Sequence, residues 1–230
     1  MKKKILTMCL VAALAATAIV GGTLAYFTDT KTETNVFTVG NVKIELIEKG
    51  EKNGVVVDWS EADKDLVPGS NTVNNVKKSV TVKNTGDSDA YMWIEVWVPA
   101  ALDDGDDNSP AAPGKGNSLH FNYDNTVTET KVTYLETKDG YNGYVHYVKN
   151  DTPKGKGQST AALLNQVYMD KAVTQCTEHG DCMILMDKET HYDGNWELKI
   201  NAVGFQADGF TIESAITEYY GKNVQEHIWQ

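Results

Sequence analysis

The stretch Ala90-Tyr91-Met92-Trp93-Ile94-Glu95-Val96-Trp97-Val98 decides the fold class of this 230-residue chain. Its side chains alternate: one face carries methionine, isoleucine and valine, and the other carries tyrosine, tryptophan and a glutamate. A period of two is typical of a β-strand, because successive side chains of a strand point to opposite sides of the sheet. Since both faces carry large apolar groups, we expect this strand to lie in the middle of a sheet that is covered on both sides.

Further strands are expected before and after this one. Apolar and polar residues alternate, or β-branched residues gather, in segments separated by turn signals such as Asn53-Gly54 and Pro68-Gly69. The strand candidates cover residues 42–46, 55–59, 76–82, 119–123, 130–135, 141–148, 167–173, 183–186 and 196–203. Short helices are expected at 160–165, capped by Ser159, and at 212–229. Together these segments predict a single all-β domain, a jelly-roll-like antiparallel β-sandwich of about nine to eleven strands with a few short helices.

The first 25 residues have the features of a secretory signal peptide. Lys2, Lys3 and Lys4 form a basic start, an uncharged stretch follows, and Thr23-Leu24-Ala25 offers a small-residue cleavage site. The alternative is an uncleaved membrane anchor, because the apolar stretch is long enough to span a bilayer. We expect a signal peptide at 1–25 and one β-sandwich domain at 26–230, secreted to the extracellular matrix or the cell surface.

The charge balance argues against a nucleic-acid-binding protein. The chain carries 21 basic and 32 acidic residues, a formal charge of −11, and all of the basic residues are lysine. Nucleic-acid binders present a basic face and use the planar guanidinium group of arginine. Without the three lysines of the signal peptide, 18 basic residues stand against 32 acidic ones, and the charge becomes −14.

Two cysteines remain after the signal peptide is removed. Cys176 and Cys182 form an even pair in a protein that is expected to reach an oxidising compartment, so we expect a disulfide between them. A short loop closed in this way gains roughly 2.4 kcal/mol from chain entropy before any strain is subtracted. The alternative is a metal site that adds His179 and His191, although this spacing matches no zinc pattern of two tight ligand pairs.

An acidic loop is a weak candidate for a Ca²⁺ site. Four carboxylates within a few residues supply the hard oxygen ligands that Ca²⁺ prefers. They belong to Asp103, Asp104, Asp106 and Asp107. The spacing is not that of an EF-hand, and the alternative is an ordinary solvated loop in an acidic protein. No other cofactor is expected.

The sequence contains neither of two common catalytic motifs. A zinc peptidase usually carries H-E-x-x-H on one helix, and a nucleophile-elbow hydrolase carries G-x-S-x-G; the chain has neither. We therefore expect no catalytic residues and no enzyme, while a metal site assembled from distant strands stays open.

The tryptophans suggest a glycan-binding face. Trp59, Trp93, Trp97 and Trp196 are accompanied by eleven tyrosines, and aromatic rings on a sandwich stack well on sugars. The alternative is that these rings pack in the core and cover the sheet faces.

Several segments resemble the TasA/camelysin (CalY) family of exported bacterial biofilm-matrix proteins. The most specific is the export junction at residues 21–29, which resembles the signal type handled by that family's dedicated signal peptidase. The others are residues 37–42, 66–70, 80–86, 89–91 and 202–210. The resemblance implies a jelly-roll sandwich, secretion by a Gram-positive bacterium and assembly into extracellular fibres. The implied partners are further copies of the chain, the signal peptidase and an accessory fibre-anchoring protein.

The resemblance also implies that the freed N-terminal segment, within residues 26–40, pairs with the sheet of a neighbouring subunit. The residues from 28 to 34 suit an extended strand, because threonines recur at every second position. Such a strand gains from main-chain pairing at an exposed edge, and the alternative is a flexible terminus. The donor residues we predict are Phe27, Thr28, Thr30, Thr32, Thr34, Val36, Phe37 and Val39.

We therefore predict a secreted structural protein, a fibre-forming subunit of the biofilm matrix that assembles by donor-strand addition. A camelysin-type secreted metalloendopeptidase is the second hypothesis, and a cell-surface adhesion or glycan-binding module is the third. Because strongly negative subunits repel one another, acid or raised salt is expected to favour assembly.

Overall fold

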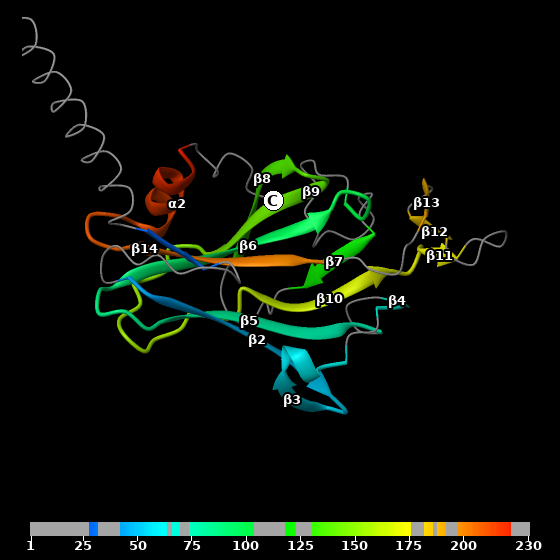
Figure 1. Cartoon of the computed structure of the whole chain (residues 1–230), viewed down its shortest axis with the longest axis horizontal. Coiled ribbons are helices and arrows are strands. Elements are labelled where there is room, and N and C mark those ends of the chain that lie inside the picture. The colour runs from blue at the N-terminus through cyan, green and yellow to red at the C-terminus, as the bar shows by residue number, and fades with distance from the viewer. Residues whose placement is uncertain are drawn as a thin grey trace, which may run out of the picture.

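A computed structural model describes residues 28–31, 42–63, 66–69, 74–103, 118–122, 130–175, 182–185, 188–191 and 197–221. Two β-sheets pack face to face, a small third sheet extends from one end, and one α-helix lies on the outside of the first sheet (Figure 1). The predicted all-β sandwich is confirmed.

The first sheet contains five antiparallel strands and is built around the stretch quoted at the outset. The strand β6 (Ala90–Pro99) pairs with β14 on one side and with β9 on the other, so its predicted central position is confirmed. The sheet order is β1 (Thr28–Lys31), β14 (Lys199–Gln206), β6, β9 (Tyr141–Val148) and β8 (Thr130–Lys138).

The second sheet faces the first across the core. Its main path is β3 (Val55–Asp58), β2 (Ile44–Lys52), β5 (Val76–Asn84), β10 (Leu164–Asp170) and β4 (Pro68–Gly69), and β7 (Leu119–Asn122) pairs with β10. The pairing of β10 with β4 is parallel and the other pairings are antiparallel. The small sheet comprises β11 (Thr174–Gln175), β12 (Cys182–Leu185) and β13 (Lys188–His191).

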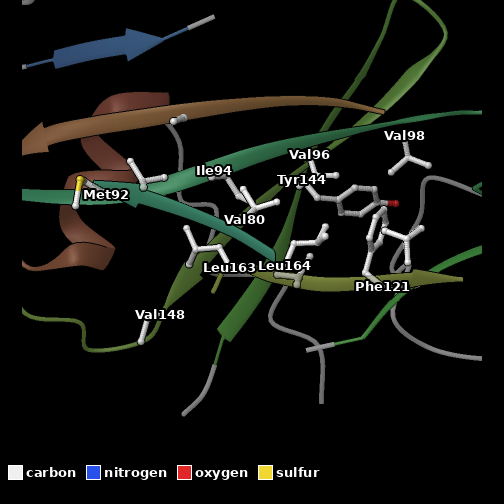
Figure 2. Close-up of a cluster of buried hydrophobic side chains, with 14 of the residues drawn as sticks. Val80, Met92, Ile94, Val96, Val98, Phe121, Tyr144, Val148, Leu163 and Leu164 are labelled. Atoms are coloured by element: carbon white, nitrogen blue, oxygen red, sulfur yellow. The ribbon is translucent and has the colours of Figure 1, made fainter. Parts of the chain in front are cut away.

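The main core lies between the two sheets. Val80 from the second sheet and Ile94 and Tyr144 from the first are fully buried there, together with Leu163 and Leu164 (Figure 2). The even-numbered side chains of β6 from Met92 to Val98 point into this layer, as the alternation predicts. Burial of such side chains stabilises a fold by about 1.5–3 kcal/mol each.

The helix α2 (Ile212–Tyr220) covers a second apolar cluster on the outer face of the first sheet. Its buried residues Ile212, Ala215 and Ile216 pack in the same cluster as Trp93 and Phe205. A capping box between Thr211 and Ser214 begins the helix, and Gly221, with φ of 63°, ends it. The predicted start at residue 212 is confirmed, but the helix ends at Tyr220; residues 222–229 lie outside the described part of the chain. No helix among the described residues is long and apolar enough to cross a membrane.

The predicted helix at 160–165 is wrong. Main-chain hydrogen bonds join this segment to β5 instead. The amide of Thr160 donates to the carbonyl of Val82 at 2.9 Å, and the amide of Leu163 donates to the carbonyl of Val80 at 2.8 Å. Leu164 then begins β10. Pairing with a distant strand therefore overrides the local capping signal at Ser159.

Candidate functional site

The N-terminal segment lies on the edge of the first sheet of its own chain. The strand β1 pairs antiparallel with β14, from Thr28 opposite Phe205 to Lys31 opposite Ala202. Of the predicted donor residues, Thr28 and Thr30 belong to β1. The remaining donor residues lie outside the described residues: Phe27, Thr32, Thr34, Val36, Phe37 and Val39. Addition of this segment to a neighbouring subunit stays a prediction.

The strand β1 covers only part of the edge of β14. All of β14 from Lys199 to Gln206 pairs with β6 on its inner side, whereas β1 reaches only from Phe205 to Ala202. Among the described residues, no strand pairs with the outer side of β14 from Lys199 to Asn201. Within the part of the chain that the structure describes, this stretch is therefore an edge at which a further extended segment could pair.

A groove of about 540 Å³ opens beneath the uncovered stretch, between the two sheets. The first sheet contributes the end of β14, and the second contributes side chains of β2, β5 and β10, with Trp59 from the short 3-10 helix η1 (Trp59–Glu61). Seven of its lining residues are apolar, namely Leu46, Trp59, Leu66, Val76, Val167, Leu198 and Ile200, and five are polar or charged, namely Glu48, Lys78, Glu197, Lys199 and Asn201. A partly apolar groove beside a strand edge suits an extended segment that carries apolar side chains on one face.

An ion pair between a buried lysine and a partly exposed glutamate lies in the wall of this groove. The ammonium group of Lys78 is 2.8 Å from a carboxylate oxygen of Glu48, and it lies 3.7 Å from the ring centre of Trp59. The Lys78 side chain is only 4% exposed, so its charge is compensated by the carboxylate and by the negative face of the indole ring. The ion pair joins β2 to β5, and the cation–π contact joins β5 to η1.

The second sheet also has a partly open edge at the groove. The strand β3 pairs with β2 only from Lys49 to Lys52, whereas β2 begins at Ile44. Leu46 and Glu48 lie in this half-paired stretch and line the groove. In the described part of the chain, strand stretches that pair on one side only therefore border the groove in both sheets.

A family model described as camelysin metallo-endopeptidase matches residues 1–139 of the chain. The chain belongs to the camelysin family. The matched region extends from the N-terminus through β8, so it includes β1 and the walls of the groove contributed by β2 and β5. No curated protein and no solved structure matches the chain.

The described residues of this camelysin-family chain do not fit a metal site. No group of three or more histidine, cysteine, aspartate or glutamate side chains gathers in the described part of the chain. The ring of His120 lies 2.9 Å from a carboxylate oxygen of Asp170, and Nδ1 of His146 bonds the carbonyl of Leu163 at 3.2 Å. Both histidines are fully buried.

The residues of the predicted Ca²⁺ site and of the predicted disulfide lie mostly outside the described part of the chain. Asp103 is buried and accepts hydrogen bonds from the hydroxyl of Tyr144 and the amide of Asn142, whereas Asp104, Asp106 and Asp107 are not described. Cys176 is likewise outside the described residues. Cys182 begins β12, and its side chain is not described. The proposed disulfide and the Ca²⁺ site stay predictions.

Of the three tryptophans that the structure describes, Trp93 is buried and Trp59 and Trp97 are partly exposed, so the glycan-binding face stays a prediction. Trp93 is fully buried under α2, with an edge-on contact to Tyr219 at 5.6 Å between ring centres. Trp97 lies flat on Gly143, where an added Cβ would sit 2.8 Å from its ring. Trp59 is engaged by Lys78, and Trp196 lies outside the described residues.

The groove itself was not predicted from the sequence. One signal for it exists: Lys78 occupies an inward position of an alternating strand, between Val76 and Val80. A lysine in the apolar row of a strand requires a buried partner. The partner, Glu48, could not be assigned without the pairing of β2 with β5.

Proposed function

We propose that this camelysin-family protein is a secreted structural subunit that assembles into extracellular fibres of a biofilm matrix. In this proposal the N-terminal segment of one copy adds as a strand to β14 of the next copy. The observation that carries the proposal is the stretch of β14 from Lys199 to Asn201, which no described strand covers on its outer side and which borders a partly apolar groove. The segment follows a signal peptide at 1–25, so cleavage during export frees its end.

The register of β1 defines which donor residues would share a face with the groove. A strand that continues past Lys31 in this register places Glu33 and Asn35 opposite Ile200 and Leu198, so polar side chains come first on that face. The next residues of the same parity are Phe37 and Val39, which share a face in an extended strand. Burial of these apolar side chains adds a hydrophobic contribution to main-chain pairing.

Truncation tests the proposal. Electron microscopy of the protein that starts at Phe27 is expected to show fibres, and the protein that starts at Gly40 is expected to remain monomeric. A variant of full mature length with Val36, Phe37 and Val39 replaced by serine separates the apolar contacts from chain length, and we expect it to form few fibres. Fibres of equal amount from all three proteins would exclude the segment as the donor.

A synthetic peptide of residues 27–39 provides a second test. If the groove accepts the segment, the peptide binds the chain that starts at Gly40 and caps growing fibres of the longer chain. A peptide of the same composition in scrambled order is the control. Equal binding of both peptides would argue against a shaped acceptor site.

The description of the family favours a metallo-endopeptidase as the second candidate. Its test is cleavage of casein by the purified protein loaded with Zn²⁺, with loss of cleavage on addition of a chelator. Absence of cleavage in the metal-loaded protein would remove this candidate.

A further inference from the structure

The outermost strand of the second sheet, β3, exposes apolar side chains on an open edge. Val55 is 63% exposed and Val56 is 68% exposed. In the described part of the chain the one strand neighbour of β3 is β2, and β3 lies at the border of the molecule (Figure 1). Natural edge strands are protected by short length, charged side chains, proline or a bulge; β3 is short and ends in Asp58, but its three valines leave the rest of the edge without a charge.

The turn of the hairpin shows where the main chain of β3 points. Asn53 and Gly54, with φ of 52° and 77°, form a two-residue turn that places Lys52 opposite Val55. In such a hairpin the pair beside the turn exchanges hydrogen bonds, and the next pair does not. Val56 belongs to this next pair, opposite Glu51. Its N–H and C=O groups therefore point away from β2, toward the open edge.

A hydrogen bond on the other side of the hairpin supports this assignment. The carbonyl of Glu51 accepts a bond of 2.9 Å from the amide of Asp63. It therefore points away from β3, as a residue of a non-bonded pair must.

Packing and polar contacts support the hairpin. Gly50 allows Ala62 and Trp59 to pack against β2, since a Cβ at position 50 would lie 2.4 Å from that of Ala62. The amide of Asn53 donates to Asp63 at 3.3 Å, and an ion pair joins Lys49 to Asp58. Such contacts reduce the entropy that the edge loses when a second strand binds to it.

The charge on the hairpin favours a second copy of this chain as the binding partner. In the paired part of the hairpin, residues 49–58, Lys49 and Lys52 balance Glu51 and Asp58, so this part is formally neutral in a chain of charge −11, and Glu61 and Asp63 follow it. Two copies that meet here avoid the repulsion that opposes contact elsewhere on an acidic surface.

We infer that β3 is a contact between copies, in which β3 of one copy pairs antiparallel with β3 of another around a two-fold axis. Val56 lies opposite Val56 of the second copy, and the two residues exchange both main-chain hydrogen bonds. A contact of four residues buries far less than the roughly 1,200 Å² of a stable interface, so it is weak in monomers. Repetition along a polymer strengthens it and aligns fibres side by side. This alignment rests on the proposed function, whereas the contact itself does not.

Cysteine cross-linking tests the contact in the exported protein without polymers. The Cα atoms of a hydrogen-bonded antiparallel pair lie about 5.5 Å apart, within disulfide range. Under copper-catalysed air oxidation at high concentration, Val56→Cys is expected to give a disulfide dimer well above the background of the unsubstituted chain. The matched control is Val67→Cys, at an exposed valine outside β3 (46% exposed). Equal dimer yields from the two variants would overturn the inference.

Charge complementation tests the two-fold symmetry. Val56→Lys places two like charges opposite each other, and so does Val56→Glu, so each alone is expected to abolish side-by-side bundling of fibres in electron micrographs. A mixture of the two is expected to restore bundling, and Val67→Lys is expected to leave it unchanged. Bundling by Val56→Lys alone at the level of the unsubstituted protein would overturn the inference. If no fibres form, the proposed function fails, and the cross-linking result still decides the β3 contact.

Discussion

At position 146 a histidine is fully buried between the two sheets. Its Nδ1–H donates to the carbonyl of Leu163, and its ring meets Phe121 edge-on at 6.0 Å. Burial lowers the pKa of His146 to about 4, because the charged form loses its hydration, and the bond to Leu163 offsets only part of this effect. The folded state therefore holds the neutral form.

This histidine makes the fold sensitive to acid. Its folded pKa is depressed below the ordinary value of about 6.5, so its contribution is complete above that value and is lost as the pH falls toward 4. Between pH 7 and pH 4.5 we expect His146 to reduce the free energy of unfolding by about 2 kcal/mol. Urea unfolding of His146→Gln should lack this part of the pH dependence, and the same slope in both proteins would contradict it.

Lys78 is a second buried titratable residue, and its charge is compensated by Glu48. Lys78→Met leaves the partly exposed Glu48 without its partner, so we expect a loss of about 2 kcal/mol in unfolding free energy. The double variant Lys78→Met with Glu48→Leu removes both charges and should recover most of that loss. Urea unfolding of the two single variants and the double variant measures the coupling, and additive losses would show that the pair contributes nothing.

At the scale of elements, a chain of hydrogen bonds fastens α2 to the first sheet. Nε1 of Trp93 donates to the hydroxyl of Tyr220 at 3.1 Å, and this hydroxyl donates to Glu95 at 2.8 Å. Burial, followed by the charge of Glu95, raises the pKa of Tyr220 well above its ordinary value, so the hydroxyl keeps its proton. Trp97 and Asn201 also donate to the Glu95 carboxylate, at 3.2 and 3.1 Å.

Removal of the Tyr220 hydroxyl should loosen the helix. Tyr220→Phe leaves Trp93 and Glu95 each without one buried partner, so we expect a loss of about 2 kcal/mol in unfolding free energy. Hydrogen exchange should show the loss first at the amides of α2. Glu218→Gln, on the exposed side of the helix, is the control. Equal protection of α2 in Tyr220→Phe and the unsubstituted chain would show that apolar packing alone holds it.

Local patterns predicted elements better than they predicted contacts between elements. The alternation in β6 correctly predicted two buried faces: its even-numbered side chains pack between the sheets, and Tyr91 and Trp93 pack on the outer face under α2. The helix predicted at 160–165 is wrong because this segment forms its hydrogen bonds with β5. Leu164 pairs with Val80, about 80 residues earlier in the sequence, and no local pattern contains that pairing. The groove depends on β14 meeting β2, and no local pattern contains such a distant contact.

For the whole molecule, the dominant long-range force between copies is repulsion. The chain has a formal charge of −11, so raised salt at pH 7 should increase the amount of polymer by screening this repulsion. Protonation of carboxylates near pH 4.5 should act in the same direction. Sedimentation of the mature protein at both pH values and at two salt concentrations measures polymer, and an equal amount under all conditions would exclude control by charge.

The sedimentation measurement near pH 4.5 also requires a test that the protein is still folded. Because His146 weakens the fold over the same pH range, unfolded aggregates would sediment as well. Circular dichroism of the pellet separates the two outcomes, since fibres of folded subunits retain the β-sheet spectrum with its aromatic near-ultraviolet signal.

The strand β1 is held to β14 by four cross-strand pairs within its own molecule. If the same segment moves to an adjacent molecule, four such pairs break and four form, so the exchange is nearly isoenergetic. The equilibrium between pairing within one molecule and pairing between two molecules would then depend on the contacts of residues that follow Lys31. Growth would depend steeply on protein concentration and would begin after a lag, set by how often the chain end releases itself from its own subunit.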